Sequence, residues 1–290
     1  MWYPDHLSIE YAEAALASKL VKLKRSGGQA YAGRLDLHSY DSHPEEHWRQ
    51  SAQAEKVIVF GLQARQSGIW VPNDVIAEYV RLHPEKLEGW ASIDPTEPGH
   101  IEEMERCRFD LGMKGLKLGP IYQHFDPTDR AVWPVYERVQ AWGWPIMWHM
   151  GTTFPRNAPL KYTIPILLED VALAFPDLKM IIAHLGHPWE VETVVLIRKQ
   201  PNVYADISAL HYRPWRYWQA LVTAMEYGVE HKLLFGSDFP SGTIENVIAG
   251  LRSVNRLVEG TQLPKVPDDM VEMIIHENWK AFFPHWSVLV

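Results

Sequence analysis

The sequence predicts a (β/α)8 barrel, and three observations support this fold class. The chain has 290 residues, a length that suits one barrel domain. Short, continuously apolar runs alternate with segments of helical period, which is typical of parallel strands covered by helices. No low-complexity or linker-like stretch interrupts the alternation. We therefore expect a single domain over residues 1–290.

The apolar runs and the segments between them give the expected elements in order. The runs that predict strands are Val57–Leu62, Gly89–Ile93, Gly115–Leu118, Pro145–His149, Met180–Leu185, Val203–Ile207 and Leu233–Gly236. The segments that predict helices are Pro72–Leu82, His100–Leu111, Ala131–Trp142, Ile164–Phe175, Trp189–Arg198 and Tyr217–Tyr227. Strands and helices in this alternation predict a parallel sheet built from βαβ units.

A closed barrel needs an eighth strand, and the sequence leaves two sources open for it. One source is Arg34–Ser39, and the other is a segment upstream of Met1, in which case the first strand is missing. Without that strand, the runs at Val57–Leu62 and Leu233–Gly236 would lack a shared neighbour. Exposed strand edges pair readily with other chains, so we would then expect oligomerisation or a helical lid over Ser8–Leu23.

Composition excludes several function classes. The formal net charge of −8 argues against nucleic acid as the main partner. No apolar run approaches the roughly 18 residues that would cross a bilayer, and the first residues do not resemble a signal peptide. A single cysteine, Cys107, excludes an intramolecular disulfide. These features predict a cytoplasmic protein, and we expect its partner to be a small-molecule substrate.

Residues of metal-binding type follow three of the predicted strands. His149, His184 and Asp238 each come directly after an apolar run. Because the carboxyl ends of parallel barrel strands meet at one mouth, these side chains are expected to face each other. A divalent ion held by such ligands can activate a water molecule near neutral pH. A single histidine here could also be structural and Asp238 could cap a helix, but three together favour a metal or catalytic role.

Several further residues are candidates for substrate contact. Lys117 lies inside an apolar strand, where an unpaired lysine is rare, so we expect it to point toward the mouth and meet a carboxylate or an anionic substrate. His187 and Arg213 follow later strands and are either substrate contacts or ordinary loop residues. Four aromatic residues are expected to frame an apolar cleft for a flat acid: Trp148, Trp189, Phe239 and Tyr122.

Read together, these segments resemble the amidohydrolase-related family, which includes aminocarboxymuconate-semialdehyde decarboxylase, resorcylate decarboxylases and pyrone-dicarboxylate lactonase. The resemblance extends from about Val57 to the helix around Glu277. The stretches that carry it are Gly115–Pro120, Pro145–His149, Ile182–Gly186, Val203–Ser208 and Phe235–Pro240. The order and spacing of Ala-His-Leu-Gly and Gly-Ser-Asp-Phe-Pro are the most specific part of this pattern.

The resemblance implies a divalent metal, most simply zinc, with His149, His184 and Asp238 in its ligand set. It also implies that His184 activates water or polarises the substrate and that Asp238 transfers a proton. One feature departs from the family: the His-x-His pair expected at the first strand has no counterpart, since Asp36 and His38 are followed by Tyr40. We expect metal-dependent hydrolysis of a carbonyl, amide or lactone. The alternatives are non-oxidative decarboxylation of an aromatic or enoic acid, and an inactive, metal-free barrel that binds a ligand or partner.

Overall fold

A curved parallel sheet forms the centre of the molecule. The computed structural model describes residues 6–25 and 42–289. Within these residues the sheet has seven strands in the order β1-β4-β5-β6-β7-β8-β9, and every pairing is parallel. The strands are β1 (Val57–Phe60), β4 (Leu87–Ser92), β5 (Leu116–Leu118), β6 (Ile146–Trp148), β7 (Met180–Ile182), β8 (Val203–Asp206) and β9 (Leu233–Leu234). All seven predicted strands are confirmed, in one sheet of barrel type.

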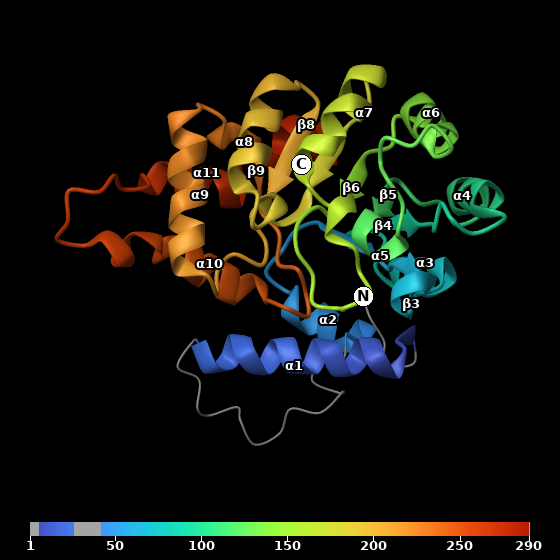
Figure 1. The fold of residues 1–290 in the computed structure, drawn as a ribbon, viewed down its shortest axis with the longest axis horizontal. Helices are drawn as coiled ribbons and strands as arrows, with labels where there is room; N and C mark the ends of the chain where they lie inside the picture. Colours follow the sequence, from blue (N-terminus) through green and yellow to red (C-terminus); the bar gives the residue numbers. More distant parts are fainter. Residues whose placement is uncertain (1–5, 26–41, 290) are drawn as a thin grey trace.

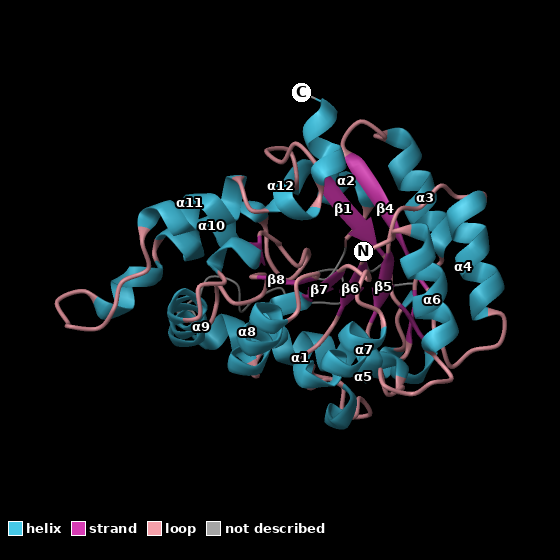
Figure 2. Cartoon of the chain, turned by 90° about the horizontal axis from the view of Figure 1, so that it is seen from above, coloured by secondary structure: helices cyan, strands magenta, loops and turns pink. Residues whose placement is uncertain are grey.

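Helices surround the outer side of this sheet (Figure 2). They are α3 (Asn73–Leu82), α4 (His100–Phe109), α6 (Trp133–Trp142), α7 (Leu168–Ala174), α8 (Glu190–Lys199), α9 (Pro214–Glu226), α10 (Ile244–Arg252) and α11 (Asp268–His276). The six predicted helices are present with shifted ends. For example, α9 starts at Pro214 rather than Tyr217, because a proline fits the first helical position. In the part of the chain that is described, no helix has both the length and the apolar character needed to cross a membrane.

Three smaller features were not predicted from the sequence. They are the short helix α2 (Pro44–Gln50), the antiparallel hairpin of β2 (Gln63–Ala64) and β3 (Ile69–Trp70), and the one-turn helix α5 (Pro120–Gln123). Each is too short to give a clear hydrophobic period. All three lie near the ends of strands, where they shape the entrance to the barrel.

Alternation along the strands separates two hydrophobic cores. In β6, Ile146 and Trp148 pack against the surrounding helices, whereas Met147 belongs to the cluster inside the sheet. The inner cluster comprises Trp90, Met147, Ile181, Ala183, Leu234, Phe282 and Phe283. Successive side chains of a strand point to opposite faces, so residues two apart share a face. This alternation decides which polar residues at the strand ends reach the interior.

The sheet is not closed by the described residues: β1 and β9 are its two ends. The segment Arg34–Ser39, considered above as an eighth strand, lies outside the described residues. The helix expected over Ser8–Leu23 is present as α1 (Ile9–Arg25). It crosses the molecule beside α2, on the side of the C-terminal strand ends (Figure 1), and Tyr11 packs against Phe154 with ring centroids 5.2 Å apart.

The C-terminal segment covers the inside of the sheet on the side opposite α1, near the start of β4. Helix α12 (Trp279–Phe282) and the following turn place Phe282 and Phe283 in the inner cluster. The indole nitrogen of Trp286 donates to Glu88 Oε2 at 2.9 Å, and that of Trp90 donates to Glu88 Oε1 at 3.0 Å. Glu88 in β4 therefore fastens the C-terminal turn to the sheet.

Lys232 gives a first testable prediction, because its buried ammonium group bonds main-chain oxygens near the end of α8. Nζ donates to the carbonyls of Ile197 and Gln200, both at 2.7 Å. The Ile197 carbonyl has no helical donor, because the residue four positions on is Pro201, which lacks an N–H. We expect Lys232→Met to lower the free energy of unfolding by about 2–3 kcal/mol in urea denaturation.

The matched control is Lys280→Met, which removes an exposed lysine paired with Glu277. Exposed pairs contribute about 0–1 kcal/mol, so this variant should unfold close to the wild-type midpoint. Equal stability of the two variants would show that Lys232 does not support the end of α8.

Candidate active site

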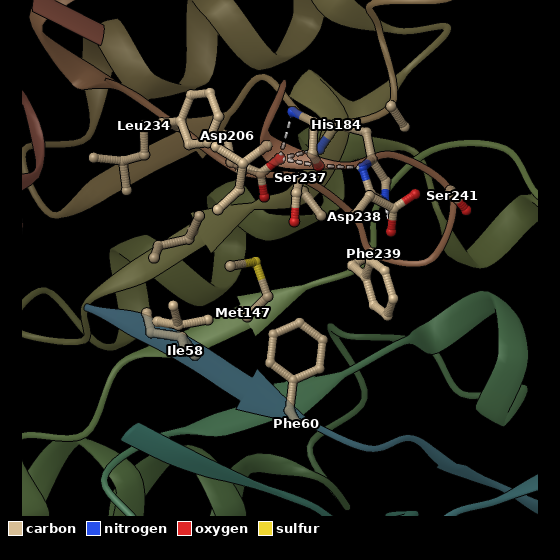
Figure 3. A pocket seen from close by; sticks show the side chains of 18 of the residues that line it. Ile58, Phe60, Met147, His184, Asp206, Leu234, Ser237, Asp238, Phe239 and Ser241 are labelled. Carbon is tan, nitrogen blue, oxygen red and sulfur yellow. Dashed lines mark hydrogen bonds and ion pairs between the residues drawn. The ribbon is translucent and has the colours of Figure 1, made fainter. Parts of the chain in front are cut away.

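The structure brings together the three residues of metal-binding type that follow separate strands. His149 follows β6, His184 follows β7, and Asp238 follows β9. The rings of His149 and His184 meet edge to face with centroids 5.1 Å apart, and His184 Nε2 lies 4.0 Å from Asp238 Oδ1. All three line a cavity of about 1280 Å³ (Figure 3 shows the part around His184 and Asp238).

The His184 ring is held in one orientation by Ser208 and Asp206. Its Nδ1 lies 2.7 Å from Ser208 Oγ, and the Ser208 hydroxyl donates in turn to Asp206 Oδ1. A hydroxyl has one proton to give, so Nδ1 must be the donor to Ser208. His184 therefore carries its proton on Nδ1 when neutral, and the lone pair of Nε2 faces Asp238 and the cavity. This nitrogen can act as a base.

Both His184 and Asp238 adopt left-handed backbone conformations, with φ of 58° and 55°. Residues other than glycine rarely occupy this region, and it is typical of sites where surroundings impose the geometry. For His184, the main-chain N–H donates to Asp206 Oδ1 at 3.1 Å. For Asp238, the carbonyl accepts from Ser241 N at 2.7 Å. These bonds fix the direction in which the two side chains enter the cavity.

His149 is buried, and its Nε2 has no hydrogen-bond partner among the described residues. Its ring packs edge to face on Tyr122, with centroids 4.7 Å apart. Burial, and then the nearby His184 and Lys117, hold the pKa of His149 well below its usual range. A neutral imidazole with an unpaired buried nitrogen is suited to bind a metal ion or a polar substrate atom.

These residues can be tested against the metal that the sequence predicts. His149, His184 and Asp238 are of the right type, and the unpaired Nε2 of His149 fits a ligand role. However, the described residues include no group of three or more His, Cys, Asp or Glu side chains placed to hold an ion. The segment 36–40, which aligns with the family's His-x-His pair in sequence, lies outside the described residues. The described residues therefore do not by themselves fit a complete metal centre.

Lys117 provides a positive charge at the wall of the cavity. It lies in β5 with 6% of its surface exposed, and its Nζ is 5.1 Å from the centre of the Phe60 ring. Burial lowers the pKa of Lys117 to about 8, while the charges of Asp206 and Asp238 oppose this shift. The ammonium has no direct ion pair within the described part of the chain. A bound anion could therefore supply its partner.

His187 and Arg213 also line the cavity, and each is held by a neighbour. His187 Nδ1 lies 2.5 Å from Glu190 Oε1. Burial is the largest single influence on the pKa of Glu190 and raises it, but the hydrogen bond with His187, a main-chain hydrogen bond and the charges of His187 and Arg216 together lower this pKa below its usual range. The Arg213 guanidinium donates to the Ala209 carbonyl and lies 4.4 Å from the centre of the Tyr212 ring. These contacts hold both side chains in one orientation at the cavity wall.

Two of the four aromatic residues expected in the cleft wall are elsewhere. Tyr122 and Phe239 line the cavity, but Trp148 and Trp189 do not. Trp148 is adjacent to Met147 in β6 and points to the opposite face, where its ring packs against Tyr136 at 5.6 Å. Trp189 comes directly before α8 and is half-buried outside the cavity. The apolar cleft is instead formed largely by inward-facing residues of β1, β6 and β9 (Figure 3).

Asp206 and Ser208 are site residues that the sequence reasoning did not single out. Asp206 is 6% exposed and accepts from His184 N, Ser208 N and Ser208 Oγ through one oxygen. A signal was present in the sequence. The carboxylate of Asp206 lies within the apolar run Val203–Ile207 and shares the inward face of Tyr204, two residues earlier. A buried carboxylate at that position needs donors, and the site supplies them.

Comparison with known proteins decides the family. A family model described as "Amidohydrolase" matches residues 40–284. The chain belongs to the amidohydrolase family. This family uses divalent metal ions, and a structural relative described below contains manganese. The resemblance inferred from the motifs is therefore confirmed, together with the barrel fold.

Individual amidohydrolase relatives are distant. A 2-amino-3-carboxymuconate-6-semialdehyde decarboxylase from Dictyostelium discoideum is 22% identical over 197 residues, which cover 58% of this chain and 55% of that protein. An uncharacterised TIM-barrel protein from Bordetella bronchiseptica superposes with a TM-score of 0.69 at 19% identity, covering 93% and 92% of the two chains. A dihydroxybenzoic acid decarboxylase from a Polaromonas species, solved with manganese and 2-nitroresorcinol, has a TM-score of 0.59 at 19% identity, covering 94% and 93%.

Ser208→Ala tests the arrangement that orients His184. Removing the hydroxyl leaves Nδ1 without its acceptor, so we expect the neutral ring to sample both tautomers. Nitrogen-15 NMR of the histidine rings should then report averaged shifts for His184 in place of one protonated Nδ1 and one bare Nε2. The matched control is Ser237→Ala, a serine that lines the same cavity. Unchanged His184 shifts in Ser208→Ala would contradict the assigned hydrogen-bond direction.

Proposed function

We propose that this chain is a carboxy-lyase that removes the carboxyl group, without oxidation, from a small aromatic or enoic acid carrying an adjacent hydroxyl or carbonyl oxygen. The observation that carries this proposal is the placement of a bare His184 Nε2 beside Asp238 and in the same cavity as the buried cation Lys117. Base, proton carrier and oxyanion partner are the groups that such a reaction needs.

The steps follow from the positions of these groups. His184 Nε2 takes the proton of the substrate hydroxyl, and the resulting oxyanion is stabilised by the Lys117 ammonium. The proton passes to Asp238 through a water molecule, because the 4.0 Å between Nε2 and Oδ1 is too long for a direct hydrogen bond. The Asp238 carboxyl group then protonates the carbon that bears the carboxylate, and the oxyanion becomes a carbonyl. The bond between that carbon and the carboxylate then breaks, its electron pair returns to the ring or double bond, and carbon dioxide leaves. The oxyanion regains a proton from solvent.

The apolar wall supports the same reaction. A carboxylate placed against Phe239 and Met147 loses hydration, whereas the departing carbon dioxide carries no charge. An apolar environment therefore destabilises the carboxylate more than it destabilises carbon dioxide, so it favours cleavage of the bond more than water does. The decarboxylases among the relatives described above are consistent with this chemistry.

Hydrolysis of a lactone, amide or other carbonyl substrate is the second candidate. The 4.0 Å between His184 Nε2 and Asp238 Oδ1 is longer than a direct hydrogen bond, so both atoms can contact one water molecule between them. His184 would then act as the base toward that water. The family name, amidohydrolase, also favours hydrolysis.

Product analysis separates the two candidates. We expect the purified chain to release one carbon dioxide per molecule of a hydroxybenzoate or enoic acid, and Asp238→Asn to lower the rate by about 100-fold or more because the proton carrier is lost. Assays run in oxygen-18 water, with and without added manganese or zinc, complete the test. Label incorporated into a ring-opened product, with no carbon dioxide, would instead identify a hydrolase.

Lys117 predicts a pH dependence for the same reaction. The ammonium stabilises the oxyanion only while protonated, so kcat/KM should fall about ten-fold per pH unit above the Lys117 pKa of about 8. Lys117→Met should lower kcat/KM by about 100-fold at pH 7 and abolish this decline. A wild-type profile that stays level to pH 10 would show that the Lys117 charge is not used.

The same substitution should raise stability, because it removes a buried charge without a direct partner. The folded-state pKa of about 8 lies below the ordinary value of 10.5, so the unfolded chain binds more protons between these pH values. Lys117→Met should therefore raise the free energy of unfolding at pH 7 by about 1–3 kcal/mol. The advantage should shrink as pH rises from 8 to 10.5, which urea denaturation at several pH values would measure.

A further inference from the structure

We infer that His187 is a second hydrogen-bonding residue for the substrate and that Glu190 is the positioning residue that orients it. The inference rests on the proposed function for the first contact, in which His184 Nε2 faces a substrate hydroxyl. It adds to the substrate a second O–H or N–H group, which donates to His187 Nε2. Neither Glu190 nor a second donor takes part in the proton transfers proposed above.

Glu190 determines which nitrogen of the His187 ring carries the proton. His187 Nδ1 lies 2.5 Å from Glu190 Oε1, and the two side chains are 13% and 5% exposed. Although burial raises the pKa of Glu190, this pKa lies below its usual range, so the carboxylate is ionised and Nδ1 is the donor. The neutral ring therefore has no proton on Nε2. Because His187 lines the cavity, this bare nitrogen is the polar atom of the ring that remains for a ligand.

Arg216 holds the Glu190 carboxylate from its other side. Arg216 Nη1, in the first turns of α9, lies 3.7 Å from Glu190 Oε2. Glu190 is also the first residue of α8, where the free N–H groups of a helix stabilise a negative charge. The carboxylate is thus buried between α8 and α9 and remains ionised. Its position fixes the direction of the His187 ring.

The main chain of His187 is fixed as well as its ring. The His187 carbonyl accepts from Thr152 N at 2.7 Å, and the His187 N–H donates to the carbonyl of His184 at 2.9 Å. A Cβ atom at Gly151 would lie 2.4 Å from the His187 carbonyl oxygen, so this close approach requires glycine. His187 is therefore joined to the segments that carry His149 and His184. It belongs to the frame of the candidate site.

A helix-stabilising role alone does not account for the Glu190 contact. The first turn of α8 has a second acid, Glu192, which could stabilise the helix without the cost of burying a charge. Glu190 instead directs its Oε1 to a ring in the cavity wall. The cavity thus contains two imidazoles of the same kind: His184 donates from Nδ1 to Ser208, and His187 donates from Nδ1 to Glu190. Two bare Nε2 acceptors suit a ligand with two donors.

Calorimetric titration of the full chain at pH 7.5 tests the inference, using 2-hydroxybenzoate and its derivatives with a second hydroxyl at each other ring position. We expect one derivative to bind about 10-fold more tightly than 2-hydroxybenzoate, because its second hydroxyl pairs with His187 Nε2. The methyl ether of that hydroxyl cannot donate, so it should lose the gain. His187→Phe should abolish the gain, and Glu190→Met should reduce it. The matched control is Glu192→Met, which should keep it.

Nitrogen-15 NMR of the free chain measures the positioning role without any ligand. We expect the neutral His187 ring to show one protonated Nδ1 and one bare Nε2 in the wild type and in Glu192→Met. In Glu190→Met the acceptor of Nδ1 is lost, so the ring should sample both tautomers and show averaged shifts. Averaged shifts in the wild type would overturn the positioning role of Glu190.

Carbon dioxide release from the same acids separates this inference from the proposed function. A donor-dependent gain that requires His187, without carbon dioxide release, supports the inference and overturns the carboxy-lyase. Release from 2-hydroxybenzoate with no gain for any hydroxyl derivative overturns the inference and supports the carboxy-lyase. Equal gains from the hydroxyl and its methyl ether, or a gain that persists in His187→Phe, also overturn the inference. Binding of none of the acids overturns both.

Discussion

The two-residue alternation of side chains along parallel strands is the constraint on which the rest of the structure depends. It places one set of apolar residues under the helices and a second set inside the sheet. It also decides which polar residues reach the interior: Lys117, His149 and Asp206 share the inward face of their strands. The site is therefore a consequence of register as much as of residue type. A shift by one residue in any of these strands would bury its polar group beneath a helix.

Much of the fold could be predicted because long, strongly patterned segments determine it. The seven apolar runs and the intervening helices were recognisable from their periods, and helix ends shifted only where local chemistry intervened, as at Pro214. The elements that the sequence did not reveal, such as α5 and the β2–β3 hairpin, are two to four residues per strand or turn. At that length, tertiary contacts rather than hydrophobic period select the conformation.

The structure places the predicted residues whose chemistry is unusual for their position at one cavity, whereas predictions that depended on side-chain orientation were wrong. His149, His184, Asp238 and Lys117 stand out as polar groups at or inside apolar runs. The prediction that Trp148 frames the cleft was wrong, because adjacent residues of a strand face opposite ways and the Trp148 ring packs on Tyr136 instead. Ser208 could not be identified from spacing alone, because its role depends on a left-handed turn at His184 that brings the ring toward it.

The position of the inner aromatic residues also has a consequence for biosynthesis. Phe282 and Phe283 belong to the inner cluster, and Trp286, which packs against it, donates a hydrogen bond to Glu88 in β4, almost 200 positions earlier. During translation, the strands can therefore associate only while the inner cluster still lacks these C-terminal aromatic residues. Until residue 286 has emerged from the ribosome, Trp90 and Leu234 lack part of their apolar cover. Apolar surface that is exposed in this way makes incompletely folded chains prone to aggregate.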